Sequence, residues 1–209
     1  YGENPHQESG IYLQGEDIKF KKIHGKQLSY NNYNDIFSAL TISKSFPKNT
    51  GTVIVKHNNP CGASIANNNL ESFKSALKCD PVSAFGGVVS CNFKVTQSLA
   101  LELNKLFLEV IIANGFDKNT LKILKSKKNL RLIDASNFSS NEILKFNSTN
   151  NSFLMQTEDQ KSFDKHNFKI VSKKKPNKSQ FENLKFALNV CRYVKSNSIV
   201  LASNKSTIG

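Results

Sequence analysis

A lysine and a histidine stand side by side after a short apolar run, and their chemistry is the easiest in the chain to state. Lys56 and His57 open the segment 56–62 (KHNNPCG), directly after 52–55 (TVIV), whose β-branched residues predict a strand buried on both faces. Ligands of open α/β sheets bind at the carboxyl ends of strands, where both side chains would then lie. A neutral imidazole can accept a proton, and an ammonium can stabilise an oxyanion. A surface lysine beside a histidine that caps an Asn-rich loop remains the alternative.

Two further segments carry hydrogen-bonding groups that could meet a small ligand. The segment 80–87 (DPVSAFGG) ends in Gly86 and Gly87, and a glycine pair lets backbone N–H groups approach a phosphate or carboxamide closely. Asn197, in 195–198 (KSNS), stands at an expected helix-to-strand junction, where its side chain could read an amide. Each segment also has a structural explanation, which is a tight turn with positive φ for the glycines and a C-terminal cap for the asparagine.

Apolar periodicity along the chain predicts strands and helices in alternation, which is typical of an α/β sandwich. The expected strands are 11–13, 18–23, 52–55, 85–89, 110–112, 130–133 and 198–202. The expected helices are 36–42, 69–79, 96–107, 117–124 and one from Ser179, which matches a capping box with Glu182. The segments 153–155 and 168–171 pair as a hairpin or run as extended connectors. The pattern predicts a three-layer α/β/α fold with a mainly parallel or mixed sheet.

The helix–strand pattern restarts late in the chain and suggests a division into parts. We expect a first α/β unit over residues 1–150, a connecting hairpin or linker over 151–178, and the start of a second α/β unit over 179–209. Both ends of the chain look cut from a longer protein, because it begins on Tyr1 and stops directly after an apolar run.

The formal charge of +13 raises the question of nucleic-acid binding. Phosphate and base-edge recognition favours Arg forks and stacked aromatics, but Arg131 and Arg192 are the two arginines among 29 basic residues. The lysine clusters at 122–128 and 173–178 contain neither feature. We interpret the charge as a solvated surface that can attract anions, including small phosphorylated substrates. A basic, non-catalytic nucleic-acid-binding module is the alternative function.

The remaining composition excludes several classes of protein. The four cysteines include no C-x-x-C pair, so neither a zinc ribbon nor a disulfide framework is indicated, and reduced thiols in a cytoplasmic enzyme are expected. No apolar run reaches the roughly 18 residues of a membrane helix. The opening YGENPHQ has neither the basic nor the apolar region of a secretory signal. We expect no membrane partner and no metal.

Six short segments, taken together and in this order, resemble the sequence motifs of a known enzyme family, although no single segment is specific enough to show it. In chain order they are YGENPHQ (1–7), LSYNN (28–32), VKHNNPCG (55–62), DPVSAFGG (80–87), EVIIA (109–113) and KSNSIV (195–200). Over nearly its whole length the chain closely resembles the formyltransferase part of the bifunctional enzyme of late purine biosynthesis. That enzyme joins AICAR transformylase to IMP cyclohydrolase.

The resemblance implies a reaction and the residues that carry it. A formyl group passes from 10-formyltetrahydrofolate, the co-substrate, to the 5-amino group of AICAR, and the parent enzyme then cyclises the product to IMP. On the family's pattern His57 is the proton acceptor and Lys56 stabilises the transition state. The residues that match AICAR-binding positions are Tyr1, Asn32, His57, Gly86, Glu109 and Asn197. Glu109 stands where some relatives carry Asp.

The resemblance also implies a fold and a partner. The family's formyltransferase has two subdomains with a cytidine-deaminase-like fold, so residues 1–150 would form the first and 179–209 would begin the second. Members are homodimers that act on small molecules and not on nucleic acid. The family's glycine-rich stretch, its substrate-binding Arg and most folate contacts should follow Gly209. We therefore expect this fragment to be inactive alone.

A zinc deaminase is the rival chemistry that such a fold suggests. It requires H-x-E and P-C-x-x-C motifs, so that one His and two Cys hold the zinc ion. This chain has His57-Asn58-Asn59 in place of the first motif, and Pro60-Cys61 is not followed by a second cysteine. We therefore expect no zinc and no deamination.

Overall fold

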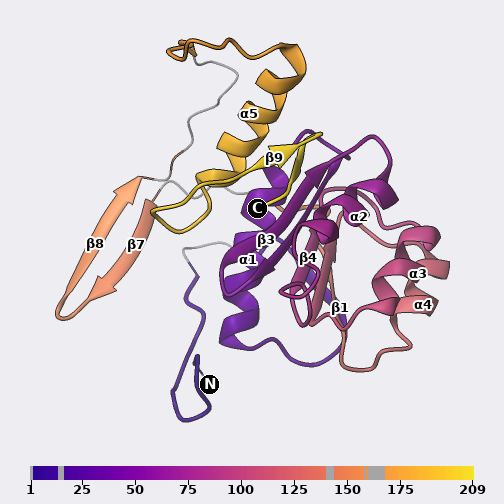
Figure 1. Cartoon of the computed structure of the whole chain (residues 1–209). Helices are drawn as coiled ribbons and strands as arrows, with labels where there is room; N and C mark the ends of the chain where they lie inside the picture. The colour runs from indigo at the N-terminus through magenta and orange to yellow at the C-terminus, as the bar shows by residue number, and fades with distance from the viewer. Residues whose placement is uncertain (1, 14–16, 140–143, 158, 160–167) are drawn as a thin grey trace. The chain divides into compact units, whose positions relative to one another are not determined.

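The structure, a computed structural model, describes residues 2–13, 17–139, 144–157, 159 and 168–209. The chain forms two compact units (Figure 1). The first comprises Tyr1–Phe138 and Pro176–Gly209, and the second Ser139–Lys175. No helix in the described ranges is long and apolar enough to cross a membrane.

The first unit is built on one mixed sheet, which has eight strands in the described residues, in the order β1-β6-β5-β4-β2-β3-β10-β9. The strands are β1 (Lys21–His24), β2 (Gly51–Lys56), β3 (Asn59–Ile65), β4 (Val88–Cys91), β5 (Val110–Ala113), β6 (Arg131–Asp134), β9 (Ala202–Ser203) and β10 (Ser206–Thr207). Strands β4, β5 and β6 are parallel, whereas β2 runs antiparallel to both β3 and β4. Of the two predicted sheet types, the mixed sheet is confirmed and the mainly parallel one is wrong.

Helices cover both faces of this sheet (Figure 1). They are α1 (Tyr30–Lys44) and α5 (Lys178–Cys191) on one face, and α2 (Asn69–Cys79), α3 (Gln97–Lys105) and α4 (Lys118–Leu124) on the other. Alternate residues of β2 face opposite layers, because Val53 and Val55 pack with α1 whereas Ile54 packs with α2 and α3. Burial of each such side chain contributes about 1.5–3 kcal/mol. The β-branched run therefore forms the doubly buried strand that the sequence predicts.

Several predicted elements differ in extent or are absent. Residues 11–13 form no strand, and β1 covers only the end of the predicted 18–23 segment. Strand β4 begins at Val88, because Phe85–Gly87 belongs to the preceding turn. Strand β3 has no counterpart in the prediction, since NPCGASI lacks the β-branched alternation by which strands are recognised. The predicted strand 198–202 overlaps β9 (Ala202–Ser203) at Ala202 alone, and residues 198–201 form no strand.

The second unit contains a hairpin that the sequence prediction paired wrongly. Strand β8 (Ser152–Thr157) pairs with β7 (Leu144–Thr149), and residues 168–171 form no strand. The two strands meet at the turn Asn150-Asn151, where Asn150 has a φ of 47°. A two-residue turn with a left-handed asparagine joins neighbouring strands directly, so a more distant partner is not needed.

Helix α5 packs on the same sheet face as α1. The rings of Phe46 and Phe186 lie 5.8 Å apart, and Asn189 Nδ2 donates to Ser45 Oγ at 2.9 Å. The helix begins with a capping box formed by Asn177 and Gln180, not by the predicted Ser179 and Glu182. The assignment of this segment to a second formyltransferase subdomain stays a prediction.

A polar network closes the carboxyl ends of the parallel strands. Asn114, after β5, donates to the Asn92 carbonyl at 2.7 Å, and Lys44 Nζ donates to Asn114 Oδ1 at 2.8 Å. The buried Asn92 amide accepts from the N–H groups of Thr50 and Gly51 and donates to the carbonyls of Ser43, Phe46 and Pro47. These contacts tie together the edge at which parallel sheets usually bind ligands.

Replacing Asn92 by Ala should destabilise the first unit by about 3 kcal/mol. The change leaves two backbone N–H groups and three carbonyls without their side-chain partner, and unsatisfied buried groups cost about 1–3 kcal/mol each unless water reaches them. Urea unfolding measures the change, with Asn137→Ala, an exposed loop substitution, as the control. A loss below about 1 kcal/mol would show that the network does not hold this edge together.

Candidate functional site

Strand direction brings the predicted site residues to the opposite edge of the sheet. Because β2 is antiparallel to β4, its carboxyl end meets the amino ends of β4 and β5, with Val55 opposite Val88 and Val88 opposite Val110. Lys56 at the end of β2 and Glu109 just before β5 therefore lie along one edge. The expected position of Lys56 at a strand's carboxyl end is confirmed, although its neighbours there are amino ends.

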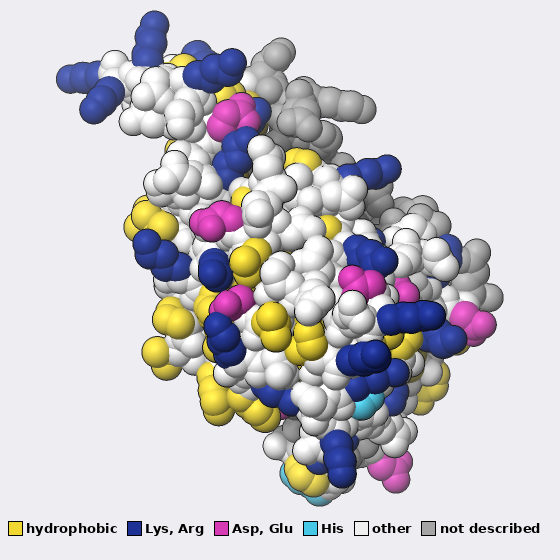
Figure 2. Space-filling model, turned by 90° about the vertical axis from the view of Figure 1, so that its right-hand side faces the viewer, with side chains coloured by type: hydrophobic (Ala, Val, Ile, Leu, Met, Phe, Trp, Pro, Cys, Tyr) yellow, Lys and Arg dark blue, Asp and Glu magenta, His cyan; other side chains and the backbone are white. Residues whose placement is uncertain are grey.

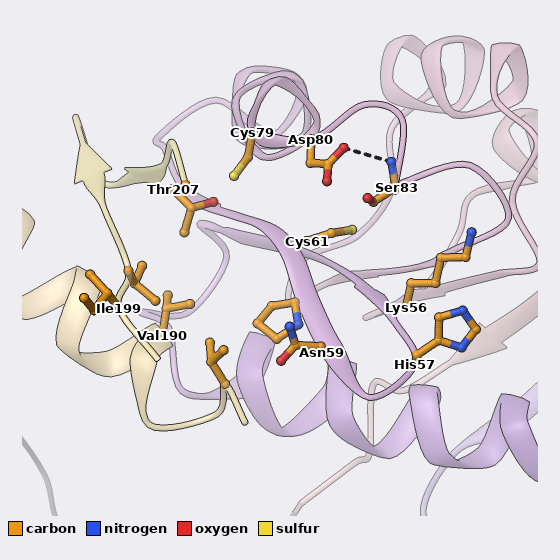
Figure 3. Close-up of a pocket in the computed structure, with 14 residues that line it drawn as sticks. Lys56, His57, Asn59, Cys61, Cys79, Asp80, Ser83, Val190, Ile199 and Thr207 are labelled. Carbon is orange, nitrogen blue, oxygen red and sulfur yellow. Dashed lines mark hydrogen bonds between the residues drawn. The ribbon is translucent and has the colours of Figure 1, made fainter. Parts of the chain in front are cut away.

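A tight turn presents Lys56 and His57. Lys56 pairs with Asn59, and His57 and Asn58 form the two-residue connection from β2 to β3 with φ of 55° and 61°. Positive φ at both positions is the type I′ geometry of a hairpin. His57 is exposed beside Lys56, as Figure 3 shows. This geometry places a base and a cation together at the tip of a rigid hairpin.

The ammonium of Lys56 is held by the turn that precedes β4. Lys56 Nζ donates to the Phe85 carbonyl at 2.8 Å. Gly86 has a φ of 72°, which a side chain disfavours, and its N–H donates to the Phe107 carbonyl at 2.9 Å. The Gly87 N–H donates to the Ala84 carbonyl at 3.0 Å. Both N–H groups thus have backbone partners in this structure, and their contact with a phosphate or carboxamide stays a prediction.

Asn32 and Glu109 meet although they are far apart in the chain. Asn32, 4% exposed, lies in the capping box of α1 with Ser29, and its Nδ2 donates to Glu109 Oε2 at 2.8 Å. Arg131 Nη1 lies 3.6 Å from the same oxygen. Arg131 was not among the predicted site residues. Its place at the start of β6, paired with Val110 of β5, brings it beside Glu109, and the sequence alone gives no signal of that pairing.

The structure says less about Asn197 and Tyr1, the other two residues predicted to bind AICAR. Asn197 is exposed in the loop after α5, and Lys195 of that loop contacts the hairpin. The Lys195 backbone N–H donates to Asn59 Oδ1 at 3.4 Å, and its Nζ donates to the His57 carbonyl at 3.5 Å. The loop thus lies beside the hairpin tip, and the two explanations of Asn197 stay predictions. Tyr1 lies outside the described residues.

A cavity of about 600 Å³ opens next to Lys56 and His57 (Figure 3). Its walls are the β2–β3 hairpin, the segment after α2 and the chain from the end of α5 onward. Asp80 and Ser83 line one side, and Val190, Val194, Ile199 and Val200 line another. Hydrogen bonds from Ser83 hold the pKa of Asp80 below its usual value, so this carboxylate stays ionised at neutral pH. The cavity therefore has charged groups of both signs and an apolar wall.

Two thiols of the first unit, Cys61 in the cavity wall and Cys91 at the far end of β4, are held in the protonated form. Burial, and after it the nearby Asp80 carboxylate, raise the pKa of Cys61, which lines the cavity, to about 11. Burial raises the pKa of Cys91 to about 12. The described residues contain no cluster of three or more His, Cys, Asp or Glu side chains that could hold a metal ion.

The basic residues of the described surface form no continuous binding strip on the face that Figure 2 shows. Lys and Arg side chains are spread over it, with acidic and hydrophobic side chains between them (Figure 2). A nucleic-acid backbone needs a stripe or patch of cations, so this face favours the interpretation of an ordinary solvated surface.

Comparison with known proteins decides the family. The family model described as the AICARFT/IMPCHase bienzyme matches residues 1–209. The chain belongs to this family. Relatives named bifunctional purine biosynthesis protein PurH include proteins of Bacillus cereus, a Thermoanaerobacter species and Persephonella marina. Each is 41% identical to this chain, over aligned lengths of 215, 213 and 217 residues respectively. Each alignment covers all of this chain and 42% of the relative. The chain thus spans less than half the length of the curated relatives it matches.

Cys61 should react slowly with alkylating reagents although it lines the cavity. Because its pKa is raised to about 11, only about one thiol in a thousand is ionised at pH 8, and the thiolate is the nucleophile. The alkylation rate should therefore rise about tenfold per pH unit and not level off below pH 10. Mass spectrometry of the Cys61 peptide measures it, with Cys61→Ser identifying the signal. A rate that levels off near pH 8 would contradict the expected protonation state.

Proposed function

We propose that this chain forms the AICAR-binding side of an AICAR transformylase active site. The reaction is formyl transfer from 10-formyltetrahydrofolate to the 5-amino group of AICAR, and the full-length parent also cyclises the product to IMP. The observation that carries the proposal is the placement of Lys56 and His57 beside the Gly86 turn, on the edge where Asn32 meets Glu109. Membership in the AICARFT/IMPCHase family supports it.

His57 acts as the proton acceptor in this proposal. The 5-amino group of AICAR is a weak nucleophile, because its lone pair is delocalised toward the carboxamide. As its nitrogen attacks the formyl carbon, a proton must leave it, and a neutral imidazole at the exposed hairpin tip can take that proton. The tetrahedral intermediate then collapses with cleavage of the bond between the formyl carbon and N10, and N10 of tetrahydrofolate leaves with the proton that the His57 imidazolium returns. Such a base contributes about 10²–10⁴-fold to the rate.

Lys56 stabilises the negative charge that develops on the formyl oxygen during attack. Its Nζ is already held by the Phe85 carbonyl at 2.8 Å, so little ordering is needed when the transition state forms. A positioned cation or donor of this kind contributes about 10²–10³-fold. The carbonyl accepts one of the three ammonium protons, which leaves two to face the substrate.

The remaining residues bind AICAR in this proposal. The Glu109 carboxylate accepts a hydrogen bond from Asn32 at Oε2, with Arg131 nearby, and has a second oxygen for substrate N–H or O–H groups. Gly86, Asn197 and Tyr1 complete the set on the family's pattern. Gly86 contributes through the shape of its turn, since its N–H is already engaged.

The proposal also includes the fold family of this chain, its oligomeric state and the part of the active site that it contributes. The mixed sheet with helices on both faces supports a cytidine-deaminase-like subdomain. We propose that residues 1–150 form the first formyltransferase subdomain and that 179–209 begin the second. We further propose a cytoplasmic homodimer that acts on small molecules and not on nucleic acid. The folate contacts lie largely in other parts of the parent, so this chain is inactive alone.

Replacing His57 by Asn in the full-length parent should lower formyl transfer by at least about 100-fold. Asn tolerates the left-handed backbone of this position, so the turn is kept while the imidazole is lost. Cyclisation of supplied formyl-AICAR by the same variant serves as the internal control and should stay unchanged. If formyl transfer remains within about tenfold of the wild type, His57 is not the general base.

Replacing Lys56 by Ala should abolish most formyl-transfer activity, and replacing it by Arg should do the same although the positive charge is kept. A compact ammonium fits beside the Phe85 carbonyl, whereas a planar guanidinium is larger and spreads its charge. Both variants should lose at least about 100-fold in turnover with a smaller change in KM for AICAR. Steady-state kinetics of formyl transfer measures the two constants. Equal turnover of the Lys and Arg enzymes would argue against a positioned oxyanion contact.

A further inference from the structure

The turn that carries His57 has an unfavourable backbone. His57 and Asn58 both adopt the left-handed region, at φ of 55° and 61°. This conformation costs a non-glycine residue about 1–2 kcal/mol, and Asn adopts it more readily than His. Strain of this kind persists only where surrounding contacts fix it. The contacts that hold this turn therefore decide where the imidazole of His57 lies.

One charged side chain supplies the shortest of those contacts. The Asn58 backbone N–H donates to Asp35 Oδ1 at 2.7 Å. Asp35 lies in the middle of α1, which is anchored to the sheet by the fully buried Ile36 and Ala39. A hydrogen bond to a carboxylate is roughly twice as strong as one between neutral groups. Asp35 thus ties the strained turn to a rigid element.

Weaker contacts complete the anchorage. Ser38, one turn further along α1, donates from Oγ to the Asn58 carbonyl at 3.4 Å. Lys195 Nζ donates to the His57 carbonyl at 3.5 Å. Asn58 Oδ1, in contrast, is buried without a hydrogen bond in the described residues. The turn is therefore held through its backbone, and Asp35 provides the one short bond among these three.

We propose that Asp35 is a positioning residue of formyl transfer, which fixes the His57–Asn58 turn through the Asn58 N–H and thereby sets the place of the His57 imidazole. This inference rests on the proposed function of His57. Asp35 acts through the turn in this account, since its Oδ1 accepts the hydrogen bond from the Asn58 N–H. Its loss acts through His57, and a misplacement of about 1 Å at a reacting group can cost about 100-fold in rate.

The test uses three variants of the full-length parent. Asp35→Ala removes the acceptor oxygen and should lower kcat about 10- to 100-fold, with a smaller change in KM for AICAR. Asp35→Asn keeps an acceptor oxygen at the same position and should remain within about threefold of the wild type. Asn34→Ala, at the neighbouring residue of α1, is the control and should leave kcat unchanged. Equal loss in the Ala and Asn variants of Asp35, or an unchanged kcat in Asp35→Ala, would overturn the proposal.

A double-mutant cycle separates positioning from general destabilisation. If Asp35 acts only by placing the imidazole, Asp35→Ala should cause no further loss in the His57→Asn background. Additive losses in the cycle would overturn the positioning role, because the two residues would then act independently.

Hydrogen exchange provides a readout that does not depend on activity. The Asn58 amide should exchange about tenfold faster or more in Asp35→Ala, and at nearly the wild-type rate in Asp35→Asn. Unchanged exchange in Asp35→Ala would overturn the anchorage itself. An inactive wild-type parent in which Asp35→Ala still speeds exchange would instead count against the proposed function, so the two failures are distinguishable.

Discussion

The antiparallel pairing of β2 with β4 is the constraint on which the candidate site depends. With Val55 opposite Val88 and Val88 opposite Val110, the end of β2 lies beside the residues that precede β4 and β5. A parallel β2 would place Lys56 at the other edge, where Asn92 and Asn114 form a network of hydrogen bonds. A shift of one residue in β2 would exchange the residues that face the two helix layers and would move Lys56 out of this position.

The two edges of the sheet therefore differ in role: one is stabilised by hydrogen bonds, and the other carries backbone strain and polar side chains. At the carboxyl ends of the parallel strands, the Asn92 side-chain amide is satisfied by backbone groups, and the edge contributes to stability. At the opposite edge the backbone is strained at His57 and Asn58, and polar side chains face a cavity. Strain and charge at one edge are tolerated because the doubly buried strands and the polar network stabilise the rest of the unit.

Much of the fold could be predicted from the local pattern of apolar residues, because strands that are buried on both faces consist of runs of β-branched residues. That signal gave β2, β5 and β6, and helical periodicity gave the centres of α1 to α4. Strand β3 carried no such signal. Its Gly62 is required by close packing, since a Cβ there would lie 2.1 Å from the Ala76 carbonyl oxygen. The direction of β2 was also hidden, because a His-Asn turn lacks the glycine that usually marks a two-residue hairpin.

The sequence was enough to pick out candidate site residues by their type and position, but it did not show which of them contact one another. Lys56 and His57 stood out because they follow an apolar run, but the contact between Asn32 and Glu109 joins residues that are 77 positions apart. Arg131 and Asp35 gave no sign of a role, since their partners depend on how β5, β6 and α1 pack together. Pairings of that kind arise from tertiary structure, which local periodicity does not contain.

The most direct test of the account is a crystal structure of the full-length parent with AICAR bound. We expect the 5-amino nitrogen of AICAR within about 3.2 Å of a ring nitrogen of His57, or one water away. Lys56 Nζ should face the position of the formyl oxygen, and Glu109 should contact AICAR. AICAR bound with its amine far from His57, or bound at the edge formed by Asn92 and Asn114, would contradict the account.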